Sequence, residues 1–165
     1  MAELTNLESK LGEVVGLALA AQEATQKVAK LAKDNGDDEL VGRLERMRDE
    51  AKETADRGTE VAGSFEGKKT AILEEAREVK QKATEMMQDY LDRASDALDG
   101  FEFLTMAEAA EVGHWSVLQK LNEKAGHDEL RELVEWALPI QQRHFQTVLE
   151  GAQTLAAEED PNEPA

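Results

Sequence analysis

Two short segments of the chain share one pattern, Leu31-Ala-Lys-Asp-Asn-Gly36-Asp-Asp-Glu-Leu40 and Leu121-Asn-Glu-Lys-Ala-Gly126-His-Asp-Glu-Leu130. In both, an apolar helical pattern ends at a glycine, a residue that suits the left-handed conformation closing many helices. Acidic residues follow, and these can cap the next helix. The repeat therefore predicts two related helical hairpins. His127, in the second turn, is expected to be exposed.

Apolar residues recur at steps of three and four on both sides of each turn, which is the spacing of one helical face. The pattern predicts helices at about 4–34 and 38–62 around the first turn, and at about 102–125 and 128–157 around the second. Two antiparallel hairpins joined by a long connection fit a four-helix bundle with a crossover. The predicted fold class is therefore all-α.

The connection between the hairpins is itself predicted to be a helix, over 68–98. Its apolar positions alternate by four and three residues: Ile72, Ala76, Val79, Ala83, Met86, Tyr90, Ala94 and Leu98. Such a regular stripe needs a surface to bury it. We expect this additional crossover helix to pack either on the bundle or, as a two-stranded coiled coil, on a second copy of the chain.

Composition restricts the classes of function. The chain has 165 residues, no cysteine and a formal net charge of −17. Lack of cysteine excludes disulfides, iron–sulfur clusters and zinc–thiolate sites and fits a reducing, cytoplasmic location. The charge argues against nucleic-acid or membrane binding, and neither a membrane span nor a signal peptide is expected. Residues 1–157 are predicted to form a single domain, and 158–165 a disordered acidic tail.

The second hairpin carries polar residues on its inward stripe. On the helix at 102–125, the apolar line through Trp115 also contains Glu108 and Glu111, and the neighbouring line contains His114. Burying a charged carboxylate without a partner is costly. We therefore expect a metal ion or a hydrogen-bond partner beside these residues.

The last helix offers Gln141 and His144 one turn apart. In a hairpin that turns near Gly126, residue 144 lies opposite about 108, and 141 opposite about 111. Glu-x-x-His is the chelating pair of di-iron and di-manganese bundles, and Glu111-Val-Gly-His114 has this spacing. The sequence thus predicts a partial metal site made of Glu108, Glu111, His114, Gln141, His144 and Glu50, the last from the first hairpin. The alternative is that these side chains only hydrogen-bond at the core edge.

Five segments carry a resemblance to a known family: Lys27-Val-Ala-Lys-Leu31, Arg48-Asp-Glu-Ala-Lys52, Ala71-Ile-Leu-Glu-Glu-Ala-Arg-Glu-Val79, Met106–Gly126 and Asp128–Ala156. In pattern and spacing they resemble the ferritin-like stress proteins typified by YciE and YciF, relatives of rubrerythrin. The similarity spans most of residues 20–157. It implies a ferritin-like bundle, often dimeric, with a di-iron or related metal site and a role in stress.

The chain departs from that family at ligand positions. Where the family carries Glu-His-x-Glu, this chain has Glu108-Ala-Ala-Glu111, and Gln141 stands at a usual carboxylate position, with His144 retained. The chelating histidine of the second helix falls at Lys52. The resemblance thus implies a degenerate site, for iron or manganese if for any metal.

The leading hypothesis is a ferritin-like, stress-related homodimer with a degenerate metal site. The alternative is a non-enzymatic helical interaction or scaffold protein without metal, suggested by the long stripe at 68–98. A lipid-surface helix in that stretch and a DNA mimic are less favoured. Whether the chain is an enzyme stays open.

Overall fold

Five α-helices make up most of the computed structural model, which describes residues 2–163. They are α1 (Asn6–Asp34), α2 (Asp38–Ala62), α3 (Lys69–Tyr90), α4 (Ala97–Ala125) and α5 (Asp128–Ala156). No β-strand occurs in this part of the chain, so the predicted all-α class is confirmed. None of the helices within these residues combines the length and the apolar character that crossing a bilayer requires.

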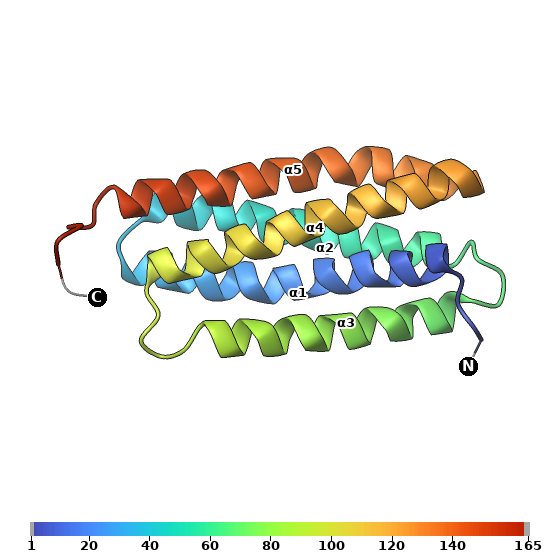
Figure 1. Cartoon of the computed structure of the whole chain (residues 1–165), viewed down its shortest axis with the longest axis horizontal. Coiled ribbons are helices and arrows are strands. Elements are labelled where there is room, and N and C mark those ends of the chain that lie inside the picture. Colours follow the sequence, from blue (N-terminus) through green and yellow to red (C-terminus); the bar gives the residue numbers. More distant parts are fainter. Residues whose placement is uncertain (1, 164–165) are drawn as a thin grey trace.

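The helices are arranged as two hairpins and one return helix. α1 and α2 form the first antiparallel hairpin, and α4 and α5 form the second (Figure 1). α1 also packs on α4, and α2 on α5, so these four helices surround a common interior. α3 runs back along the outside of α1, which brings the start of α4 to the same end of the molecule as the start of α2 (Figure 1).

Each hairpin turn contains a glycine with positive φ, as the repeated segment predicts. φ is 81° at Gly36 and 71° at Gly126, a region that residues with a side chain rarely adopt. Asp37 then caps α2, because its carboxylate accepts a hydrogen bond of 3.0 Å from the backbone N–H of Leu40. This confirms the turn chemistry expected for the first hairpin.

In the second turn, a histidine caps the next helix in place of the expected acidic residue. The His127 ring accepts a hydrogen bond from the backbone N–H of Leu130 at 3.4 Å and so caps α5. The same ring stacks on Phe65, with centroids 4.3 Å apart. The expectation that His127 is simply exposed is therefore wrong, because the loop after α2 lies against this turn and half-buries the ring.

The crossover helix is shorter than the 68–98 predicted from its stripe. α3 ends at Tyr90, and Leu98 lies in α4, which begins at Ala97 and not near 102. Between the two helices, the Asp92 carboxylate accepts hydrogen bonds from the backbone N–H groups of residues 94 and 95, at 2.7 and 3.1 Å. Such a local bond stabilises a turn in place of the next helical turn, an effect that apolar spacing does not reveal.

α3 packs closely on α1 because α1 has glycines at the contact. A Cβ at Gly12 would lie 2.7 Å from the carbonyl oxygen of Ile72, and one at Gly16 would lie 2.4 Å from that of Ala76. The first half of the crossover stripe is accordingly buried within the chain. Near the end of α3, however, Met86 stays 52% exposed.

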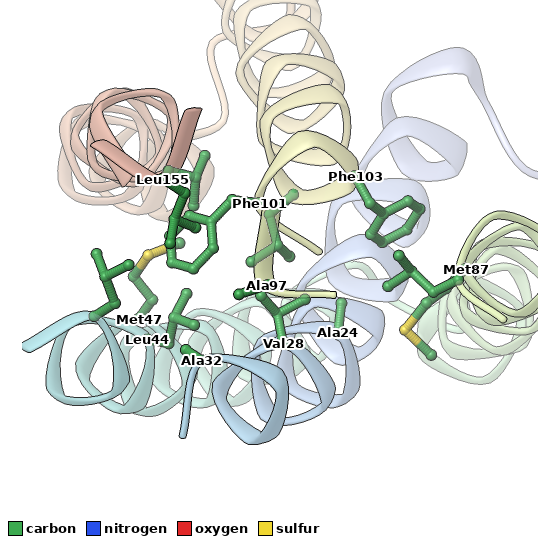
Figure 2. Close-up of a cluster of buried hydrophobic side chains, with 14 residues drawn as sticks. Ala24, Val28, Ala32, Leu44, Met47, Met87, Ala97, Phe101, Phe103 and Leu155 are labelled. Atoms are coloured by element: carbon green, nitrogen blue, oxygen red, sulfur yellow. The ribbon is translucent and has the colours of Figure 1, made fainter. Parts of the chain in front are cut away.

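Two apolar clusters fill the interior, one toward each end of the helices. In the first, shown in Figure 2, Phe101 points toward Leu155 and Met47, and Phe103 points toward Met87 of α3. The second is built around Trp115 and residues 130–137 of α5. Between the clusters lies a layer of buried polar side chains: Thr54, Glu108, Glu111, Gln141 and His144.

The acidic segment after α5 is not helical. Residues 158–163 form exposed turns, and residues 164–165 of the expected tail lie outside the described part of the chain. Disorder of the tail therefore stays a prediction.

Candidate functional site

Five of the six side chains predicted for the site meet in the polar layer between the apolar clusters. α4 supplies Glu108 and Glu111, α5 supplies Gln141 and His144, and α2 supplies Glu50. The pairs on α4 and α5 are three residues apart, a spacing that keeps two side chains on one face of a helix. All four are at most 3% exposed, so the site lies inside the protein.

The amide of Gln141 joins the two buried carboxyl groups. In the orientation that satisfies both partners, its nitrogen donates to Oε2 of Glu108 and to Oε2 of Glu111, each at 3.2 Å. The opposite orientation suits protonated carboxyl groups, because the amide oxygen can accept from their O–H groups. One side chain of α5 can thus satisfy both glutamates of α4 in either protonation state.

Glu50 of α2 holds the His144 ring by a hydrogen bond. The ring Nε2 lies 2.6 Å from Oε2 of Glu50, and the other oxygen of Glu50 accepts a hydrogen bond of 2.6 Å from Arg143. A histidine that donates from Nε2 leaves the lone pair of Nδ1 free. This Nδ1 lies 3.7 Å from Oε2 of Glu108, so the free lone pair is directed into the buried layer.

Burial changes the protonation of the two carboxyl groups on α4. It raises the pKa of Glu111 to about 8. It also raises the pKa of Glu108 well above its usual value, and the neighbouring Glu111 carboxylate adds to this effect. Both groups therefore favour the neutral form at pH 7 unless a positive charge lies beside them.

On the α2–α5 side of the site, the pKa shifts are opposite in direction to those of Glu108 and Glu111. Burial acts to raise the pKa of Glu50, but the hydrogen bonds from His144 and Arg143 outweigh it, so the pKa lies below its usual value. Burial also lowers the pKa of His144, although Glu50 opposes this shift. The arrangement favours an ionised Glu50 beside a neutral imidazole, which is the form that binds metals.

His114, the sixth predicted residue, is not brought to this layer. Its Nδ1 lies 2.9 Å from Oε2 of Glu13 and 3.3 Å from Nζ of Lys10, both on α1. The pair Glu111-Val-Gly-His114 therefore has the right spacing for chelation, but its two side chains contact different helices. Glu111 faces Gln141 of α5, whereas His114 faces Glu13 and Lys10 of α1. The spacing within α4 does not show which neighbouring helix each side chain meets.

Sequence reasoning did not identify Arg143 as part of the site. Together with Arg43 and Arg46 it borders a hollow of about 300 Å³ that leads from the surface to Glu50 and His144. On the far side of the layer, a narrow apolar cavity of about 60 Å³ between α1, α3 and α4 borders Glu108 and Glu111. α1 itself contributes mainly alanine to that cavity and no carboxylate.

The donor atoms of the layer are those that could hold a single divalent cation. Two oxygens that bind one octahedral ion at about 2.1 Å are about 3 Å apart, close to the 3.2 Å between the Gln141 amide and each carboxyl oxygen. With the amide oxygen turned inward, the set is three oxygens and the Nδ1 of His144, which suits iron(II) or manganese(II). Glu50 then orients the imidazole, as carboxylates commonly do for metal-binding histidines.

The amide is essential to this donor set. Within residues 2–163, no three histidine, aspartate or glutamate side chains form a group that could hold a metal ion by themselves. The set described above therefore depends on Gln141.

Comparison with known proteins adds no relative. No protein-family model, curated protein or solved structure matches this chain.

Proposed function

We propose that the chain is a ferritin-like helical-bundle protein that binds one divalent cation, iron(II) or manganese(II), in its buried polar layer. The order and direction of the helices support the fold assignment, because two hairpins joined by a lengthwise crossover are the arrangement of ferritin-like bundles. The family resemblance extends the proposal to a stress-related, cytoplasmic role. We propose a homodimer as the functional form.

The observation that carries this proposal is the convergence of Glu108, Glu111, Gln141 and His144 from two helices. Two buried carboxyl groups share one amide at 3.2 Å, and a neutral imidazole directs Nδ1 toward them. A cation would replace the two carboxyl protons and relieve the cost of ionising these groups in the interior. When bound, such an ion supplies Lewis acidity and, for iron, one-electron chemistry.

A second candidate function is a metal-free helical scaffold. It is favoured by the hydrogen bonds of Gln141, which satisfy both carboxyl groups without any ion. In this alternative the polar layer fixes the register of α4 against α5, a role that buried polar groups fill in some helical proteins.

An anaerobic titration of the full-length protein separates the two candidates. We expect iron(II) or manganese(II) to bind at one ion per chain, measured by calorimetry and by metal analysis after gel filtration. His144→Ala and Glu111→Ala should abolish stoichiometric binding, because each removes a donor atom. Glu50→Gln should weaken it about 10- to 100-fold, since it disturbs the orientation of His144 without removing a ligand.

His114→Ala is the matched control, because His114 lies on the same helix as Glu111 but contacts Glu13 of α1. This variant should bind the ion like the wild type. Absence of stoichiometric binding in the wild type, or equal losses in the His114 and His144 variants, would reject the metal proposal and leave the scaffold.

A further inference from the structure

The outer face of α4 is an apolar surface in a highly charged molecule. α4 packs on α5 and α1, and it crosses the front of the molecule in Figure 1 with its outer side uncovered. Met106 and Val117 are 44% and 48% exposed on this side. The helix carries only Ala109, Ala110 and Gly113 between them there, all exposed. A large apolar residue thus lies at each end of a stretch of small residues.

Charged residues continue this face in both directions, and their signs differ. Asp99 and Glu102 lie toward the start of α4, and Lys120 and Lys124 lie toward its end. Because helical residues repeat every 3.6 positions, these four side chains project on the same side as the apolar centre. Along the helix, the outer face therefore carries carboxylates, then apolar residues, then two lysines, with Glu123 paired to Lys120 at its edge.

This order is complementary to itself when two copies run antiparallel. A two-fold axis at the level of residues 111 and 112 places Met106 against the partner's Val117, and Glu102 against the partner's Lys120. It also places Asp99 near the partner's Lys124. A parallel pair would oppose like charges at both ends, which is unfavourable. The charge order of this face thus favours the antiparallel orientation.

We propose that the outer face of α4 is a homodimer interface in which two copies pack antiparallel across a two-fold axis. A second copy of the chain fits the charge order twice in one contact, as an isologous interface requires. The Lys120 side chain is 73% exposed and pairs with Glu123 of the same helix at 2.8 Å, and the partner's Glu102 would add a second carboxylate to this ammonium group. The interface rests on the homodimer proposed above, but it does not involve the buried polar layer or any metal.

The oligomeric state of the full-length protein tests the surface. Sedimentation equilibrium should give a dimer, and Val117→Glu should convert it to a monomer, because a carboxylate would be buried against the partner's Met106. Gln153→Glu, at an exposed position of α5, is the control and should remain dimeric. A monomeric wild-type protein, or a dimer dissociated by the Gln153 variant and not by the Val117 variant, would overturn the proposal.

A charge exchange tests the orientation. Glu102→Lys and Lys120→Glu should each weaken the dimer, by about tenfold for two opposed contacts, because each places like charges together. The double variant, Glu102→Lys with Lys120→Glu, should restore the wild-type dissociation constant. A double variant as weak as the sum of its single changes would exclude the antiparallel pairing.

Disulfide trapping tests the register without relying on stability. The described chain has no cysteine, so Met106→Cys and Val117→Cys introduce single thiols. Each variant alone should not cross-link, since two copies of one position are about 16 Å apart along an antiparallel pair, far beyond the reach of a disulfide. A mixture should form the mixed disulfide dimer. Cross-linking of either variant with itself, or no cross-linking in the mixture, would contradict the proposed register.

Discussion

Glu111 and Glu108 are carboxyl groups that the fold withdraws from water. They are 3% and 1% exposed, and the Gln141 amide is the partner that reaches both of them. The free energy of ionising a carboxyl group is much less favourable in such surroundings than in solvent. The metal-free protein should therefore prefer both groups protonated, and its stability should depend on pH.

The first prediction concerns Glu111→Gln. The pKa of Glu111 is raised to about 8 in the folded protein, so its contribution is fully present below its unfolded pKa and is lost as the pH rises through 8. Between the unfolded pKa of about 4.3 and pH 8, the free energy of unfolding should fall by up to about 1.4 kcal/mol per pH unit through Glu111 alone, and this fall should level off above pH 8. The variant, which cannot ionise, should lose that part of the pH dependence.

Urea denaturation between pH 7 and 9, with a chelator present, measures the effect. This range avoids the titration of His144, whose pKa burial lowers. The variant should be more stable than the wild type at pH 9, and the difference should shrink toward pH 7. Parallel pH profiles for the two proteins would show that Glu111 is not buried as described.

At the scale of elements, α3 differs from the other helices in how it is held. It packs mainly on α1, and this contact depends on the notch formed by Gly12 and Gly16. A Cβ at Gly16 would lie 2.4 Å from the Ala76 carbonyl oxygen, closer than the atoms of a packed interior can approach. Filling the notch should therefore displace the crossover helix.

The second prediction is that Gly16→Ala destabilises the protein by about 1–3 kcal/mol through overpacking, although alanine is the better helix former. Hydrogen exchange in Lys69–Tyr90 should accelerate more than in the other helices. Gly42→Ala is the control, because nothing lies within 4 Å of a Cβ there, and it should stabilise the protein by about 0.5–1 kcal/mol. Similar effects of both substitutions would mean that the notch does not hold α3.

The elements that the sequence predicts well are those encoded by local chemistry. Gly36 and Gly126 mark both turns, and three-and-four spacing places the helices around them. The end of α3 could not be predicted in this way, since the Asp92 turn interrupts an apolar stripe that continues through Leu98. Nor could the spacing on α1 show that its glycines receive α3, because a close approach depends on two helices.

In the candidate site, too, the sequence predicts what is encoded within one helix and misses what depends on contacts between helices. The spacing on α4 and α5 predicts that Glu108, Glu111, Gln141 and His144 share a layer, and the structure brings them together. The positions of His114 and Arg143 depend on α1 and α2, which carry Glu13 and Glu50. A pattern within one helix cannot say which residue a neighbouring helix presents.

At the scale of the whole molecule, the net charge of −17 opposes any association between copies. Two such charges on the order of 25 Å apart repel by tens of kcal/mol in pure water, before counterions screen them. The exposed ion pairs across the proposed α4 interface contribute only about 0.2–1 kcal/mol each. Repulsion between the net charges of the two copies is therefore a larger effect than the ion pairs at the interface. We expect this repulsion to determine how the dimer responds to salt.

The third prediction is that the dimer becomes tighter as salt is added. Between about 10 and 150 mM sodium chloride the Debye length falls from about 30 to about 8 Å, which removes most of the repulsion and leaves the contact of Met106 with the partner's Val117 intact. Sedimentation equilibrium across this range should show a dissociation constant that falls by at least about tenfold. A dimer that dissociates as salt is added would instead be held mainly by its ion pairs, and the apolar centre of the α4 face would not be the source of its affinity.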